Sequence, residues 1–345
     1  MRSSRTPLAC ALWAVLLAPT ARAQNAVQGF DAERLYPSAP GAGWFVMDSL
    51  DMHGELGGAL SLSGRYARDP LRVGGTAVVT DSAYGQLAVA VTWRVLRFSL
   101  GFDFPVAVKG RTVTLAGYAY PGPDLDLGSH PDALSDVRLG VDARLLGAAD
   151  GPFRLGLGAH LWIPSGPVDQ YVSDGTYRGM VRLLLAGDLG AFTYAGNLGV
   201  HIRPRDDGGV PGAPRGSEFL WGGAAGAKLP IGDSHRAVIG PEVYGASAFQ
   251  GLFKSETTTA EALLTVRYEG SGSSGPQLRL KLGAGVGVGS NFGTPAWRLL
   301  FQVEMFGQNE WPAPETTERE SGSSPANRTG ADLAFQHPVM PPATR

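Results

Sequence analysis

Charged side chains recur at every second position in several segments of this 345-residue chain. In 136–145, Asp136, Arg138, Asp142 and Arg144 alternate with apolar residues. A period of two places alternate side chains on opposite faces of a β-strand. Charges that line the interior of a closed sheet can attract ions and select them by sign. The spacing therefore predicts an interior face that carries the chemistry of this chain.

The same alternation assigns a set of charged side chains to the interior of a transmembrane barrel. On the lipid face such a charge costs roughly 2–4 kcal/mol at the midplane. The set has ten basic and seven acidic members: Arg97, Asp103, Asp136, Arg138, Asp142, Arg144, Arg154, Arg178, Arg182, Asp188, Glu242, Glu261, Arg267, Arg279, Lys281, Arg298 and Glu304. The basic excess favours anions in an open lumen. A static salt-bridge network in a closed lumen is the alternative. Strand number leaves both open, since about eight strands are filled by side chains and roughly 16–18 leave a channel.

Catalysis is not expected from the same face. His160 and His201 fall on it, but neither has a nucleophile at a matching strand spacing. The stretch 283–289 (GAGVGVG) lacks the GxGxxG spacing, and no helix is predicted after it, so we interpret it as glycine-rich strand. No cofactor and no metal site are predicted, and we expect the chain not to be an enzyme.

The elements that position these charges are predicted to be about twelve strands. Alternation marks 54–66, 86–94, 96–108, 135–146, 152–163, 176–188, 190–203, 216–228, 235–248, 257–268, 276–289 and 295–306. Each has about the length that crosses a bilayer when tilted. Long loops (67–85, 109–134, 164–175, 203–215, 249–256) alternate with short turns, as in outer-membrane barrels. The predicted fold is an all-β, antiparallel, up-and-down transmembrane β-barrel, with aromatic belts that include Tyr66 and Trp297 at the outer edge.

Composition divides the chain into four parts. Residues 1–23 have the basic, apolar and A-x-A regions of a signal peptide, which contains the single cysteine, Cys10. Residues 24–53 are predicted to be a periplasmic lead-in, 54–306 the barrel, and 307–345 a disordered periplasmic tail. The sequence leaves open whether residues 24–43 enter the lumen or lie beneath it. After residue 24 no stretch of 18 apolar residues occurs. The predicted location is the outer membrane, with the start of the mature chain on the short-turn side.

Two stretches resemble a known barrel module. Phe30-Asp31-Ala32-Glu33-Arg34 with 44–51 (WFVMDSLD), and later 134–141 (LSDVRLGV) with Arg144-Leu145-Leu146, resemble the outer-membrane barrel that precedes an OmpA-like peptidoglycan-binding domain. The resemblance spans about 25–306 and implies an envelope barrel. This chain departs from that family after the barrel, where only the short tail follows.

The predicted function is a narrow pore or small-solute channel. The alternative is a non-conducting structural barrel that anchors surface loops and a periplasmic tail, and a soluble secreted β-sandwich is a third hypothesis. Predicted partners are outer-membrane lipid and small solutes or ions. Near-balanced charge, 29 basic against 31 acidic residues, gives no reason to expect nucleic acid.

Overall fold

The computed structural model describes residues 25–232, 235–270, 276–289 and 292–309. The predicted signal peptide (1–23) lies outside the described residues, and so does the predicted tail from residue 310 onward. Within the described part no helix is long and apolar enough to span a membrane.

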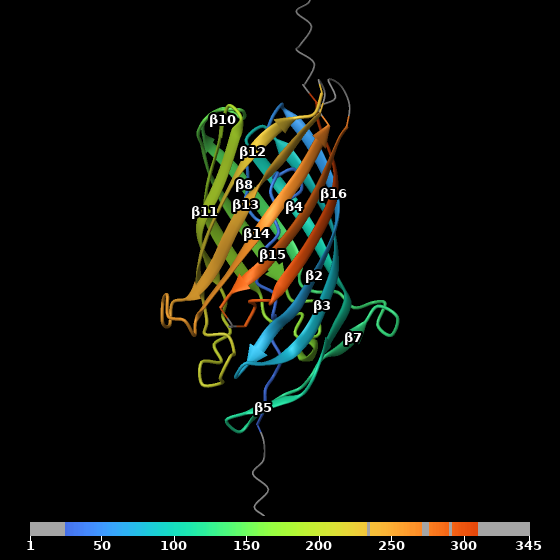
Figure 1. Cartoon of the computed structure of the whole chain (residues 1–345), viewed down its shortest axis with the longest axis vertical. Helices are drawn as coiled ribbons and strands as arrows, with labels where there is room; N and C mark the ends of the chain where they lie inside the picture. Colours follow the sequence, from blue (N-terminus) through green and yellow to red (C-terminus); the bar gives the residue numbers. More distant parts are fainter. Residues whose placement is uncertain (1–24, 233–234, 271–275, 290–291, 310–345) are drawn as a thin grey trace, which may run out of the picture. The chain divides into compact units, whose positions relative to one another are not determined.

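Twelve of the described strands form a closed antiparallel barrel (Figure 1). They are β2 (Leu56–Val73), β3 (Thr76–Trp93), β4 (Leu96–Gly110), β8 (Val137–Leu146), β9 (Arg154–Ile163), β10 (Arg178–Leu189), β11 (Phe192–Ile202), β12 (Glu218–Pro230), β13 (His235–Ala248), β14 (Thr258–Gly270), β15 (Gln277–Val288) and β16 (Trp297–Asn309). Each strand pairs with its neighbour, and β16 pairs with β2 to close the ring. The predicted all-β barrel of about twelve strands is confirmed.

The long loops contain short elements of their own. β5 (Val113–Leu115), β6 (Tyr118–Tyr120) and β7 (Asp124–Asp126) lie between β4 and β8, and the 3₁₀ turn η1 (Val168–Gln170) lies between β9 and β10. β1 (Asn25–Ala26) pairs in parallel with β6. These elements gather at one end of the barrel, here called the long-loop end (Figure 1).

The two faces of the barrel wall differ sharply in chemistry. On β9, Leu157 and Leu161 are more than 40% exposed, whereas Arg154 and His160 on the opposite face are buried. The same contrast recurs on β15, where Leu282 is exposed and Lys281 is buried. Period two thus turns apolar side chains outward and charged ones inward, as a barrel in lipid requires.

One predicted loop is a continuation of the barrel strands. Residues 67–85 belong largely to β2 and β3, which pair up to Val73 and Thr76 and turn at Gly74–Gly75. Both glycines have positive φ, as two-residue hairpin turns require. The pairing register shifts between Arg68 and Leu71, and the positive φ of Asp69 lies within this irregularity. This bulge interrupts the alternation, which is why the sequence pattern suggested a loop.

The segment before the barrel lies inside it, which decides the question, left open by the sequence, whether residues 24–43 enter the lumen or lie beneath it. Residues 27–55, here called the inner segment, start beside β6 at the long-loop end and reach the opposite end at Glu55, which pairs with Arg94 of the β3–β4 turn. The described chain therefore begins at the long-loop end and not at the short-turn end. Alternation could not reveal this course, because the inner segment contains one isolated bridge (Gly43–Asp48) and no barrel strand.

Candidate functional site: the inner segment and the charged wall

The side chains of the seventeen charged residues singled out from the sequence lie in the interior of the barrel or at its rim. Fourteen are buried, and Asp103, Arg144 and Asp188 are partly exposed. Asp103 accepts a hydrogen bond from Arg65, Arg144 donates to the carbonyl of Met52, and Asp188 pairs with Arg154. The set is thus one shell of charge around the inner segment.

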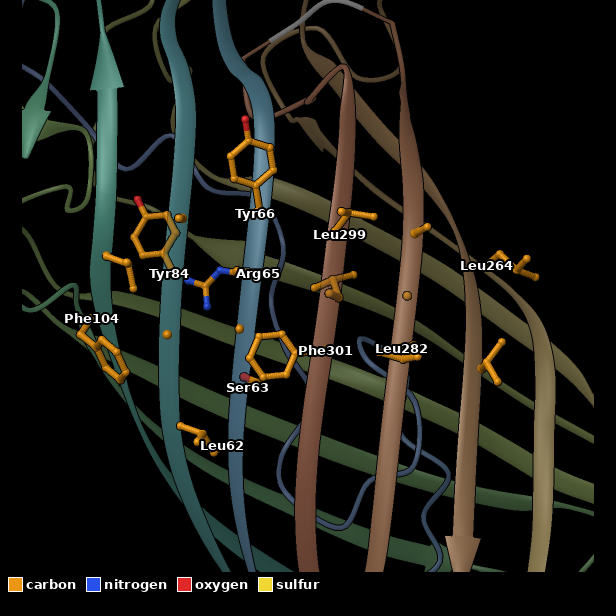
Figure 2. A pocket seen from close by; sticks show the side chains of 18 residues that line it. Leu62, Ser63, Arg65, Tyr66, Tyr84, Phe104, Leu264, Leu282, Leu299 and Phe301 are labelled. Carbon is orange, nitrogen blue, oxygen red and sulfur yellow. The ribbon is translucent and has the colours of Figure 1, made fainter. Parts of the chain in front are cut away.

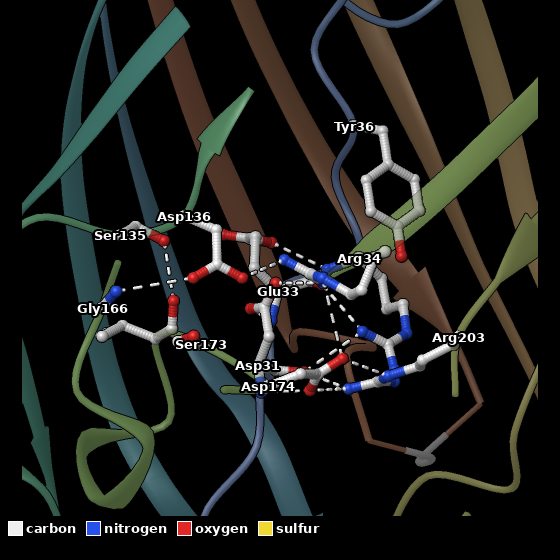
Figure 3. Close-up of polar contacts among 12 residues, drawn as sticks. Asp31, Glu33, Arg34, Tyr36, Ser135, Asp136, Gly166, Ser173, Asp174 and Arg203 are labelled. Carbon is white, nitrogen blue, oxygen red and sulfur yellow. Dashed lines mark hydrogen bonds and ion pairs between the residues drawn. The ribbon is translucent and has the colours of Figure 1, made fainter. Parts of the chain in front are cut away.

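Near the long-loop end, carboxylates of the inner segment pair with arginines of the wall. Arg178 Nη1 lies 2.6 Å from Asp31 Oδ2, and its Nη2 lies 2.9 Å from Asp136 Oδ2. Asp174, in the β9–β10 loop, accepts the Asp31 amide at 2.9 Å and also pairs with Arg203 (Figure 3). Asp31 is therefore held through its carboxylate by β10 and through its backbone amide by the β9–β10 loop.

Two residues further along the inner segment, Glu33 lies between two wall arginines. Arg298 Nη2 lies 2.7 Å from Glu33 Oε1, and its Nε lies 2.8 Å from Glu261 Oε2. Arg65 Nε lies 3.4 Å from Glu33 Oε2. Because these groups are removed from bulk water, loss of either partner would leave an uncompensated buried charge.

The backbone of the inner segment is recognised as well as its side chains. The buried carboxylate of Glu242 accepts hydrogen bonds from the amides of Phe45 (3.0 Å) and Val46 (2.9 Å). Lys281 Nζ donates to the Trp44 carbonyl at 3.1 Å. A segment without regular pairing still needs partners for its polar groups, and wall charges supply them here.

Near the short-turn end, a carboxylate of the inner segment again pairs with a wall arginine. Arg97 Nη1 lies 2.8 Å from Asp48 Oδ2, and both side chains are almost fully buried. Arg97 Nη2 also lies 3.5 Å from Asp51. Beyond this point His53 pairs with Asp150 of the β8–β9 turn at 3.1 Å. The inner segment is thus attached to the wall along its whole length.

Apolar contacts fix the middle of the inner segment. Trp44, Phe45, Met47 and Leu50 are buried in a cluster with wall residues such as Leu184. A Cβ on Gly222 would lie 2.4 Å from the Met47 methyl group, so this glycine lets the segment approach the wall closely. This packing holds the middle of the inner segment against the wall.

Two small cavities flank the inner segment. One, beside Tyr36 and Arg182, measures about 20 Å³, and a second, beside Glu33 and Tyr84, measures about 10 Å³. Each has room for about one water molecule. In this conformation the barrel offers no wide aqueous path at these two levels.

The two inward histidines have ionic partners and no nucleophile in contact. His160 Nε2 lies 3.2 Å from Asp142 and 3.0 Å from Arg182. His201 Nδ1 lies 3.3 Å from Glu218 and 3.1 Å from the Tyr36 hydroxyl. These contacts are those of a buried polar network.

Sequence reasoning missed the charges of the inner segment and several of the wall. The missed wall charges are Arg65, Asp174, Arg203, Glu218, Lys228 and Glu269, and those of the inner segment are Asp31, Glu33, Arg34, Asp48 and Asp51. A useful signal was present: charges spaced through an otherwise apolar stretch of 27–53 need buried counter-ions.

Outside the barrel wall, a charged contact joins β7 to the end of β4. Lys109 Nζ lies 2.8 Å from Asp126 Oδ2, and the Ser129 amide donates to Asp126 Oδ1 at 2.8 Å. Hydrogen bonds from Lys109 and Ser129 lower the pKa of the Asp126 carboxyl well below its usual range. This contact holds the long β4–β8 connection against the barrel.

Comparison with known proteins bears on the fold. No family model and no curated protein matches the chain. An outer membrane channel from Pseudomonas putida F1 superposes with a TM-score of 0.50 at 12% identity, over 74% of this chain and 96% of that one. The chain has the fold of an outer-membrane β-barrel. The NanC porin (TM-score 0.43, 11% identity, 71% and 98% covered) and LpxR from Salmonella typhimurium (0.36, 11%, 72% and 100%) are less similar. The resemblance to the OmpA-like module stays a prediction.

Proposed function

We propose that this protein resides in the outer membrane and is a narrow channel for small anions, held closed in the described conformation by its inner segment. The location is supported by the barrel fold and by the exposed apolar band on its outer face. The closed state is supported by the course of residues 27–55 through the lumen.

The observation that carries the proposal is the charge balance between wall and segment. The seventeen wall residues predicted from the sequence have three more positive than negative charges, and the six missed wall charges add none. Within the lumen the inner segment has four carboxylates (Asp31, Glu33, Asp48, Asp51) and one arginine (Arg34), an excess of three negative charges, while its last carboxylate, Glu55, pairs with Arg94 of the β3–β4 turn. The segment therefore neutralises a positive wall, as a bound anion would.

Movement of the inner segment would change both the size and the charge of the lumen. Many of its contacts to the wall are ionic or hydrogen-bonded, so a displaced segment leaves charged side chains that water can hydrate. The positive excess then faces the path and attracts anions. Each buried pair that breaks without solvation costs about 3–5 kcal/mol, so openings of the native chain are expected to be rare.

Single-channel recording in a planar bilayer tests this proposal. A Glu33→Gln, Asp48→Asn variant weakens two attachments and is expected to raise the opening frequency at least about tenfold over the native chain. Reversal potentials in a KCl gradient should show preference for chloride. A matched control, Asp126→Asn, removes a carboxylate outside the lumen and should leave conductance unchanged. Folded variants that never open would contradict the proposal.

The second candidate is a permanently closed barrel that anchors its loops. It is favoured by the apolar packing of Trp44, Phe45 and Met47 against the wall, which opposes movement. In that case the same variants lose stability without gaining conductance. An enzymatic role is not proposed, because His160 and His201 are buried among ionic partners.

A further inference from the structure

The larger of the two small cavities lies between the inner segment and the part of the wall formed by β10 to β13. Arg34, Tyr36 and Val46 line it from the inner segment, and Arg182 of β10 and Asn197 of β11 line it from the wall. Arg34 and Arg182 are each only 3% exposed, so both cations are removed from bulk solvent. The cavity measures about 20 Å³ and therefore accepts one particle of about the size of a water molecule.

The two arginines of this cavity have N–H groups that find no acceptor in the described part of the chain. Nε and Nη2 of Arg34 and Nε of Arg182 are buried and form no hydrogen bond. The remaining contacts of these side chains are in place, since Arg34 Nη1 donates to the carbonyls of Asp31 and Glu33, and Arg182 Nη2 lies 3.0 Å from His160 Nε2. A buried donor without an acceptor is costly, and more so on a charged group. An acceptor is therefore expected inside the cavity.

The neighbouring carboxylates do not take up these N–H groups. Glu218 Oε1 lies 3.3 Å from Arg34 Nη2, but the two atoms form no hydrogen bond. Asp142 Oδ1 lies 3.7 Å from Arg182 Nη2, beyond hydrogen-bond distance. Neither carboxylate is among the residues that line the cavity. These ion pairs balance the arginine charges but leave the donors that face the cavity free.

The smaller cavity, beside Tyr84, has a different chemistry. Of the side chains that line it, Ser82 and Tyr171 have buried hydroxyls without a partner in the described part of the chain. A hydroxyl both donates and accepts, so a water suits this cavity. Arg65 lies over the Tyr84 ring at 4.5 Å, and both its Nε and its Nη2 donate to carboxylates (Figure 2). Unpartnered cationic donors thus distinguish the larger cavity from the smaller one.

We propose that the cavity beside Arg34 and Arg182 binds one monatomic anion, of which chloride is the common example. A water has two lone pairs for three N–H groups, whereas a spherical anion accepts from all three. Hydrogen bonds between cationic donors and an anion are also the stronger kind. The size admits a single ion and excludes a polyatomic oxyanion such as sulfate. The ion would join the inner segment to β10. This inference does not require conduction, because a barrel that never opens can hold the ion.

Anomalous scattering from bromide in crystals of the full chain tests the site. Bromide is a monatomic anion like chloride, and its anomalous signal distinguishes it from water. Crystals are grown without chloride and soaked in a series of bromide concentrations. Ala246→Val adds two methyl groups to a buried alanine that lines the cavity, and Ala90→Val makes the same change at a buried position of β3 outside it. Heat-dependent gel mobility establishes that each variant is folded.

The native chain and Ala90→Val are expected to show a bromide peak in the cavity that saturates at millimolar concentration. Folded Ala246→Val should lose that peak, because the added methyl groups occupy the space of the ion. Excess chloride should displace the bromide, whereas excess sulfate should not. The site is overturned by a native chain without the peak, by a peak that needs molar bromide, by displacement with sulfate, or by a peak that persists in folded Ala246→Val. A bromide peak in a barrel that never conducts would contradict the proposed channel and leave the anion site in place.

Discussion

Glu242 of the barrel wall accepts a hydrogen bond from the backbone amide of Val46 in the inner segment, at 2.9 Å, although the two residues are 196 positions apart. The same carboxylate also accepts the Phe45 amide, and its side chain is buried. An anion that binds successive amides holds the path of the backbone and not only one side chain.

Substitution of this carboxylate is expected to loosen the inner segment. Glu242→Gln keeps the shape but removes the charge, and hydrogen bonds to charged groups contribute about 1.5–3 kcal/mol. The opening frequency in planar bilayers should rise by about tenfold or more. Thr265→Val, which removes only the hydroxyl that donates to Glu242 at 2.6 Å, should have a smaller effect. If a folded Glu242→Gln variant opens as rarely as the native chain, the hydrogen bonds from the Phe45 and Val46 amides to Glu242 do not hold the segment.

The Arg97–Asp48 pair is expected to show strong coupling. Arg97→Met alone leaves the Asp48 carboxylate buried without its cation, which costs about 3–5 kcal/mol in the free energy of unfolding. Adding Asp48→Asn should recover part of that loss, while Asp51 still lacks its 3.5 Å partner. Urea unfolding in detergent micelles, followed by tryptophan fluorescence, gives the free energies of unfolding of the native chain, the two single variants and the double variant. Additive losses would mean that the pair contributes no coupling.

The start of the described chain is expected to be accessible from the long-loop side. Ala26 is exposed in β1, next to β6. Cys10 is the only cysteine and belongs to the predicted signal peptide, so Ala26→Cys gives a single label site. A membrane-impermeant maleimide should label it on intact cells. Ala148→Cys, exposed in the β8–β9 turn at the other end, should react only after lysis. The reverse pattern would invert the orientation.

The Lys109–Asp126 contact is expected to survive mild acid. Because the folded pKa of Asp126 is lowered, its stabilising contribution is complete above the ordinary aspartate pKa of about 3.9 and is lost only as pH falls through the lower folded value. Hydrogen exchange at the Ser129 amide, corrected for its intrinsic rate, should show constant protection from pH 7 to about 4. Asp126→Asn should reduce that protection throughout. If protection of the Ser129 amide in the native chain were half lost at a pH near the ordinary aspartate pKa, the lowered pKa of Asp126 would be contradicted.

Much of the barrel could be predicted because strands impose a strict period of two. Arg138 and Asp142 were placed inward by parity alone, and the structure buries both. The β2–β3 hairpin was underestimated because Asp69 and Pro70 interrupt the alternation at a bulge, while pairing resumes at Leu71. Local pattern cannot show that cross-strand hydrogen bonds continue past such an interruption.

Sequence alone determined the number of strands, the faces of their side chains and the signs of the interior charges, because each depends on local periodicity and on the cost of charge in lipid. Only the tertiary structure decided which charges pair. Glu33 meets Arg298, 265 residues away, because ring closure brings β16 beside β2 and the inner segment passes both. The close approach of Phe301 to Gly64 and of Phe104 to Gly85 likewise exists only when β16 and β4 lie on either side of the β2–β3 pair. Contacts between distant strands follow from closure of the barrel, which no local period encodes.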